Sequence, residues 1–194
     1  MKWQQRKSWE TRRKLLNAAL ICLERDGFHS FRLDRVAGEA GVSKGALTHH
    51  FANKDDLLVH AIEKVLDEFV EALACGADEF HDGHLTLDGF LDLVWHYMSG
   101  QLYMVTLEIA LKARHEPDFK NLLTPQVRRF HSRIDDIWER LFPHLPPERS
   151  RHLMNLSMNL LRGMGTQSVF REDSQYFNEL LNSWKAILRQ EVAS

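Results

Sequence analysis

Cysteines and long apolar runs are scarce in this sequence. Its 194 residues include two cysteines, Cys22 and Cys75, which are too few for a disulfide framework. Both lie in apolar helical patterns, so we expect buried free thiols, which suit a reducing cytoplasm. The longest unbroken apolar run is residues 18–23, whereas a helix needs roughly 20 residues to span a membrane. Residues 1–14 contain no apolar segment, so we expect no signal peptide.

Sequence signatures of enzymes and metal centres are also missing. No nucleophile or paired-carboxylate motif stands out, so we expect no catalytic residues and no cofactor. His81 and His84 lie three residues apart around Asp82 and Gly83, but a closed metal site needs further ligands, so we expect no metal. The chain shows no strand alternation, no repeat and no low-complexity segment. Helical periodicity is what remains, and it predicts an all-α fold.

Positive charge is concentrated near the N-terminus. Residues 1–54 carry 11 Lys/Arg and 5 Asp/Glu, whereas residues 55–194 carry 14 and 22. A basic module on an acidic remainder indicates a polyanionic partner for the module alone. A chance excess of solvated charge is the alternative interpretation.

A short apolar pattern in the basic module predicts a helix that ends at a glycine. Leu33, Val36, Ala37 and Ala40 share one helical face, as the spacing of an amphipathic helix requires. Gly41 takes a positive φ at no steric cost, so it can end this helix in a sharp turn.

A second short helix is expected directly after this turn. Ser43 is a good N-cap for residues 44–50, and Leu47 and Phe51 share an apolar face four residues apart. Two short helices joined by a glycine turn form a helix–turn–helix, whose second helix can lie in the major groove of DNA.

These residues resemble a known family. Gly27-Phe28, the segment VAGEAGVSKGAL at 36–47 and the segment HFANKDDL at 50–57 are similar to the DNA-binding region of the TetR family of bacterial transcriptional regulators. The resemblance covers residues 11–61, about a quarter of the chain. It implies an all-helical homodimer whose C-terminal domain binds a small molecule that usually releases the dimer from its operator.

The resemblance and the side-chain chemistry together predict the residues that contact DNA. Lys44 can donate to guanine O6 and N7, Gly45 lets the backbone approach closely, and Thr48 can contact a base edge or a thymine methyl. His49 and Lys54 suit phosphates. An exposed polar face is the alternative. The predicted DNA-binding residues are Arg32, Ser43, Lys44, Gly45, Ala46, Thr48, His49 and Lys54.

The sequence departs from the family at two positions of this region. Phe31 replaces a small hydroxyl residue that often caps the second helix and touches a phosphate; Ser30 or Arg32 are the candidates to replace it. Thr48 stands where the family often has tyrosine.

Caps and apolar stripes predict the other helices. Residues 1–9 read as a mobile basic arm, followed by a helix that Ser8 or Thr11 caps and that ends near Asp26. Asn53 caps a helix to about Gly76, with a polar loop at 78–84. The later helices are expected at 86–99, 102–115, 125–142, 147–164 and 174–192, with Thr124 capping the third of them and Ser174 the last.

Aromatic and methionine residues outside the basic module suggest an apolar ligand site between the helices that start near Thr86 and Thr124, although such stripes are often plain core. The residues predicted to bind the ligand are Trp95, Met98, Met104, Glu108, Phe130, His131 and Met158.

The last two helices carry wide apolar faces that either complete the fold or form a four-helix bundle with a second subunit. The residues predicted for this dimer interface are Leu153, Leu156, Leu160, Leu181, Trp184 and Leu188.

We therefore expect a DNA-binding domain at 1–54 and a ligand-binding and dimerisation domain at 55–194. The expected function is that of a cytoplasmic homodimeric repressor, with double-stranded operator DNA and a hydrophobic or aromatic effector as partners and no membrane association. An activator, or a repressor that needs its ligand as co-repressor, is the nearest alternative. A helical small-molecule carrier with an incidental basic face is the alternative from another class.

Overall fold

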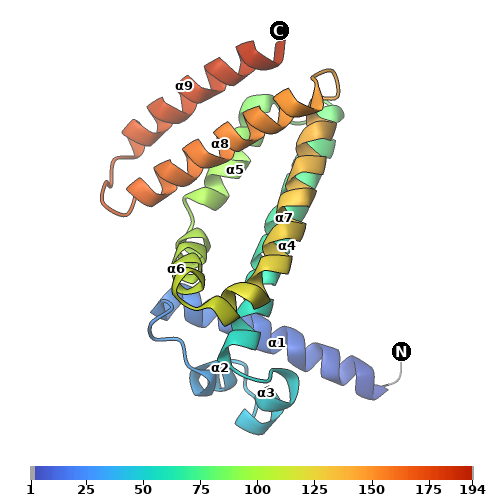
Figure 1. Cartoon of the computed structure of the whole chain (residues 1–194), viewed down its shortest axis with the longest axis vertical. Coiled ribbons are helices and arrows are strands. Elements are labelled where there is room, and N and C mark those ends of the chain that lie inside the picture. Colours follow the sequence, from blue (N-terminus) through green and yellow to red (C-terminus); the bar gives the residue numbers. More distant parts are fainter. Residues whose placement is uncertain (1–2, 194) are drawn as a thin grey trace. The chain divides into compact units, whose positions relative to one another are not determined.

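The described part of the protein, residues 3–193 without the side chain of Gln4, is all-α in the computed structural model (Figure 1). The sequence-based prediction of the fold class is therefore confirmed. Its nine helices are α1 (Trp3–Asp26), α2 (Leu33–Glu39), α3 (Lys44–His50), α4 (Lys54–His81), α5 (Leu87–Met98), α6 (Gln101–His115), α7 (Pro117–Leu141), α8 (Pro147–Gln167) and α9 (Ser174–Ala193).

The helices pack into two compact units. Unit 1 comprises Met1–Leu66 and Met104–Arg128, and unit 2 comprises Asp67–Tyr103 and Arg129–Ser194. Helices α4, α6 and α7 each contribute residues to both units. This division follows packing, whereas the predicted boundary at residues 54 and 55 concerns function and stays a prediction.

The apolar stripe of α1 forms much of the core of unit 1. Leu15, Ala19 and Leu23 have no exposed surface, and Leu47 of α3 is equally buried. Helix α1 packs on α2, and α2 packs on α3. Burial of each such leucine stabilises the fold by about 1.5–3 kcal/mol, so the position of α3 is fixed mainly by its apolar side.

Helix α6 completes unit 1 through polar contacts. The Glu108 carboxylate accepts a hydrogen bond from the backbone N–H of Phe28, with 2.8 Å between Oε2 and N. Lys112 pairs with Asp55 at 3.2 Å, and its Nζ lies 4.6 Å from the centre of the Phe119 ring.

In unit 2, α5, α8 and α9 pack against one another. Phe90, Leu91, Leu161 and Leu188 of these helices are completely buried. Gly165 of α8 admits the closest approach, because a Cβ there would lie 2.1 Å from the carbonyl oxygen of Met98. The α8 helix therefore continues through its glycines to Gln167, although the sequence suggested an end at 164.

The predicted N-terminal arm is wrong where the structure describes it. Helix α1 already begins at Trp3, while residues 1 and 2 lie outside the described part. Local pairs stabilise this extra turn: Arg6 pairs with Glu10 at 3.1 Å, and Lys7 lies 5.4 Å from the Trp3 ring centre. Pairs at spacing i, i+4 of this kind support an exposed helix.

Two other helix boundaries also differ from the prediction. Helix α4 continues past Gly76 to His81. A Cβ at Gly76 would lie only 2.8 Å from the Leu93 side chain, so this glycine allows close packing and does not end the helix. Helix α7 starts at Pro117 and contains Pro125 in its interior. A proline costs an internal helix one hydrogen bond and some crowding, whereas Pro117 suits a first helical position.

Two local assignments need correction as well. The cap of α9 is Asp173, whose Oδ1 accepts from the Tyr176 N–H at 3.0 Å, in place of the predicted Ser174. Cys22 is buried as expected, but Cys75 is exposed on α4, because it lies off the apolar face of that helix. Both thiols are free.

Candidate functional site

The turn that ends α2 has the predicted geometry. Gly41 has a φ of +65°. The N–H of Gly41 donates to Gly38 O at 3.1 Å, and the N–H of Val42 donates to Ala37 O at 3.0 Å. These two bonds satisfy carbonyls that the end of a helix leaves free. The chain can then reverse within a few residues and start α3.

The start of α3 is fixed by a side-chain cap. Ser43 has extended backbone angles, and its Oγ accepts a hydrogen bond from the Ala46 N–H at 3.1 Å. Leu47 and Phe51, at 0% and 1% exposure, hold the opposite side of α3 in the core. Lys44, Gly45, Thr48 and His49 are consequently exposed, while Ala46 is half-buried.

The Thr48 side chain is partly used by its own helix. Its hydroxyl lies 3.2 Å from Lys44 O and 3.1 Å from Gly45 O, so the proton is donated to the backbone. The methyl group and a hydroxyl lone pair remain for a partner. This arrangement suits contact with a thymine methyl better than donation to a base edge.

Two histidines close α3 in different environments. The rings of His49 and His50 lie 5.4 Å apart, but His49 is exposed and His50 is half-buried. Burial lowers the pKa of His50, and the neighbouring His49 and Arg12 lower it further. His50 is therefore neutral near pH 7, whereas His49 is accessible to a phosphate.

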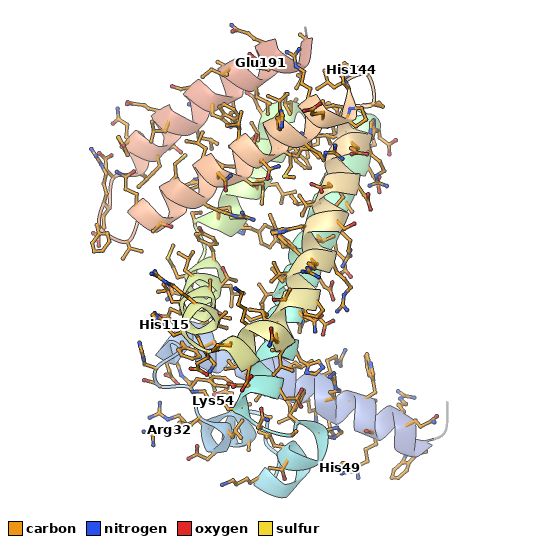
Figure 2. The ribbon with its side chains drawn as sticks, in the orientation of Figure 1. Arg32, His49, Lys54, His115, His144 and Glu191 are labelled. Carbon is orange, nitrogen blue, oxygen red and sulfur yellow. The ribbon has the colours of Figure 1, made fainter. Side chains whose placement is uncertain are left out.

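Arg32 lies directly before α2 and Lys54 is the first residue of α4; both belong to unit 1 and are labelled in Figure 2. Arg32 is the N-cap residue of α2, yet its side chain makes no capping bond, so its exposed guanidinium is available to an anion. Phe31 is fully buried, at 1% exposure. The hydroxyl cap typical of the family is thus replaced by a core aromatic residue.

Lys54 also serves the packing of unit 1. Its Nζ lies 4.9 Å from the ring centre of Phe28 and 5.7 Å from that of Phe31. Burial lowers the pKa of Lys54, and Lys112 adds to this effect. A cation over aromatic rings contributes to stability, so Lys54 has a structural role beside the predicted phosphate contact.

The predicted ligand-binding residues fall into two groups. Phe130, His131 and Met158 line one cavity of about 210 Å³ in unit 2, between α7 and α8. No α5 residue lines this cavity, although the sequence suggested that helix as a wall. The other lining residues, which the sequence analysis missed, are Ile134, Asp135, Met154, Asn155 and Arg162. A signal for Arg162 was present, because it is the only charged residue between Leu153 and Phe170.

The other predicted ligand residues lie elsewhere. Trp95 packs on Phe177, with ring centres 5.7 Å apart, and Met98 is buried in the core of unit 2. Met104 and Glu108 belong to unit 1, where Glu108 accepts the hydrogen bond from Phe28. The structure therefore does not bring all seven residues together.

The residues predicted for the dimer interface differ in exposure. Leu153, Leu181 and Leu188 are buried within unit 2, and Trp184 is half-buried with its Nε1 donating to Ser157 Oγ at 3.0 Å. Leu156 is 56% exposed and Leu160 36%. Ile187 of α9, which the sequence analysis did not select, is 48% exposed. The exposed leucines are the ones that a second subunit can cover.

Within 3–193, no three His, Cys, Asp or Glu side chains gather in a way that would hold a metal ion. His81 Nε2 instead lies 2.7 Å from the Arg140 carbonyl oxygen. No helix in this range is long and apolar enough to cross a membrane.

Comparison with known proteins agrees with this geometry. The sequence profile described as "Bacterial regulatory proteins, tetR family" matches residues 15–61, which include all eight residues predicted to contact DNA. The chain is 26% identical over 192 residues to the HTH-type transcriptional regulator CymR of Pseudomonas putida, covering 98% of this chain and 95% of that protein. Residues 15–61 thus form a DNA-binding region of the TetR family.

A second relative of the chain is the HTH-type nicotine-responsive transcriptional repressor HdnoR of Paenarthrobacter nicotinovorans. The two are 30% identical over 115 residues, which is 58% of this chain and 59% of HdnoR. The crystal structure of the multidrug binding protein EbrR complexed with imidazole has the same fold, with a TM-score of 0.62, 22% identity and coverage of 89% of this chain and 93% of that one.

The family assignment decides between the functional classes left open by the sequence. The protein is a DNA-binding transcriptional regulator and not an enzyme. A helical carrier without a DNA function is not favoured.

Proposed function

We propose that the protein is a homodimeric repressor that binds a palindromic operator and is released by a small-molecule effector. The observation that carries the proposal is the exposed face of α3, where Lys44, Gly45, Thr48 and His49 surround a rigidly capped helix start. Polar side chains at the N-terminal end of such a helix are suited to contact base edges in the major groove.

Two-fold symmetry follows from the kind of DNA site. One α3 helix contacts only a few base pairs, so a second copy about 34–36 Å away is needed to reach the next major groove. Leu156 and Leu160 on α8 are exposed apolar residues that a second copy can bury. We assign the dimer interface to this face of α8 together with α9.

Release by an effector is supported by the relatives and by the cavity. HdnoR is named as a nicotine-responsive repressor, and the EbrR structure contains imidazole. The chain itself has a cavity of about 210 Å³ in unit 2. Helices α4, α6 and α7 contribute to both units, so they provide a covalent route by which ligand binding lowers operator affinity through a population shift.

A gel-shift assay with the DNA upstream of the protein's own gene tests the proposal. We expect a discrete retarded band, competed by the same DNA but not by random DNA, with affinity that falls steeply as salt rises. Equal competition by random DNA would contradict sequence-specific repression. A reporter gene under that upstream DNA distinguishes the alternatives, because an activator raises expression and a co-repressor-dependent protein represses only when ligand is added.

A further inference from the structure

An arginine without a counter-ion lies in the wall of the unit 2 cavity. Arg162 on α8 is half-buried and lines the cavity with its neighbours from α7. Within residues 3–193, its guanidinium makes no hydrogen bond and no ion pair. Its backbone is fixed, since the Tyr103 hydroxyl donates to the Arg162 carbonyl oxygen at 3.1 Å.

A guanidinium in this position favours an anionic partner. It stays charged at neutral pH and offers five N–H donors in a planar fork that matches a carboxylate. Burial lowers the pKa of Arg162, and Tyr103 alone opposes that effect. The protein therefore partly removes this positive charge from water without a carboxylate close enough to influence the pKa of Arg162.

The floor of the cavity is apolar. Phe130 and Ile134 of α7 are 7% and 3% exposed, and Met154 and Met158 of α8 are 6% and 2% exposed. The volume of about 210 Å³ is below the roughly 300–1,000 Å³ of sites for drug-sized ligands. A ligand whose apolar part is a single ring or a short alkyl chain fits this volume.

The remaining polar groups at the rim are His131, Asp135 and Asn155. Partial burial and the charge of Arg162 lower the pKa of His131, against the opposing effect of Asp135, so the imidazole is neutral near pH 7. Asp135 lies one helical turn from His131 and influences it, whereas no carboxylate influences Arg162. Arg162 is thus a positive charge in the cavity wall that no carboxylate of the cavity pairs with.

We propose that the effector is a small hydrophobic carboxylate, with its carboxylate paired to Arg162 and its apolar body on Phe130, Ile134 and Met158. This proposal rests on the ligand-responsive function proposed above and adds the chemical class of the ligand. Asn155 and neutral His131 supply further hydrogen bonds to the carboxylate oxygens.

Calorimetric titration of the full-length protein at pH 7.5 tests the class of ligand without any mutation. The probes are benzoate, phenylacetate and hexanoate, with neutral benzamide and cationic benzylamine as matched controls. We expect at least one of the three acids to bind, and benzoate to bind at least tenfold more tightly than benzamide and benzylamine.

Variants then test the role of Arg162. Arg162→Gln should weaken binding of the acids by about ten- to a hundredfold, because a charge-assisted hydrogen bond is lost, while benzamide binding changes little. Arg162→Lys should recover part of the loss. Arg151→Gln is the matched control on the same helix, because Arg151 pairs with Glu139 at 3.7 Å and does not line the cavity.

The proposal is overturned by any of three results: none of the acids binds at millimolar concentration, benzamide binds as tightly as benzoate, or Arg162→Gln binds benzoate like the unmodified protein. Tighter binding of benzylamine that is lost in Asp135→Asn would replace it with a cation site. If Arg162→Gln does not fold, the comparison of benzoate with benzamide decides alone.

A gel shift without any acid separates this proposal from the proposed function. Operator binding without acid binding rejects only the ligand class. Acid binding without operator binding supports the cavity and rejects the proposed repressor.

Discussion

The Glu108 carboxylate on α6 accepts a hydrogen bond from the backbone N–H of Phe28, directly after the end of α1. Gly27, with a φ of +71°, ends α1, and its N–H donates to Leu23 O at 3.0 Å. The next N–H has its partner 80 residues further along the chain. The turn between α1 and α2 is therefore held by a side chain that the sequence assigned to a ligand site.

Removal of this acceptor should destabilise unit 1. We expect Glu108→Ala to lower the free energy of unfolding by about 1–3 kcal/mol, because a partly buried N–H loses its partner. Glu108→Gln keeps an acceptor oxygen and should lose clearly less. Urea unfolding followed by circular dichroism measures both, and equal stability of Glu108→Ala and the unmodified protein would show that solvent replaces the carboxylate.

Loss of the α3 cap should affect stability and DNA binding together. Ser43→Ala removes the acceptor for the Ala46 N–H and should cost about 0.5–2 kcal/mol. Ser43→Asn retains a capping oxygen, so its stability should stay near that of the unmodified protein. Urea unfolding again provides the measurement, with operator affinity from gel shifts. An unchanged midpoint for Ser43→Ala would mean that the cap is dispensable.

Lys44 and Arg32 should contribute differently to operator binding. Lys44→Ala should lose about 1–3 kcal/mol on the operator and relax discrimination at one base pair. Arg32→Ala should weaken binding to all DNA sequences alike, and it should reduce the slope of log affinity against log salt concentration by about one. Fluorescence anisotropy on operator and random DNA over a salt series checks both. Lys44 would not be a base contact if its removal weakened both DNAs equally.

The exposed leucines of α8 should be needed for the dimer. Leu156→Glu and Leu160→Glu place a charge on apolar surfaces that are 56% and 36% exposed, so they should dissociate the dimer with little damage to the protomer. Leu111→Glu, at a leucine that is 57% exposed in unit 1, is the matched control. Sedimentation velocity measures the oligomeric state, and an intact dimer in both α8 variants would show that the interface lies elsewhere.

His50 should make unit 1 less stable in mild acid. Its folded-state pKa lies below the ordinary 6.5, so the unfolded chain takes up a proton first as the pH falls. Stability is therefore complete above about pH 6.5 and decreases as the pH falls towards the folded-state pKa. His50→Gln should reduce the loss of stability between pH 7 and pH 5, measured by urea unfolding. His152→Gln, at an exposed histidine, is the control. If His50→Gln lost as much stability between pH 7 and pH 5 as the unmodified protein, His50 would not be the source of the loss.

The sequence was sufficient for the helix–turn–helix because its determinants are local. The positive φ of Gly41, the Ser43 cap and the shared face of Leu47 and Phe51 all act within four residues, and the structure has each of them. Helix boundaries were less predictable where packing intervenes. Gly76 and Pro125 look like helix ends in the sequence, yet both lie inside helices. Gly76 allows close packing, and α7 tolerates the hydrogen bond that Pro125 cannot donate.

The cavity and the polar contacts of unit 1 were decided by the tertiary structure alone. Periodicity shows which face of a helix is apolar, but it does not show which helix covers that face. Glu108 and Arg162 are both charged residues in apolar helical surroundings. The sequence around each residue does not show which one has a structural role and which one lines a cavity. Folding gives Glu108 an N–H donor 80 residues away and leaves Arg162 facing a cavity, because the partner of a buried charge is set by packing between helices distant in the chain.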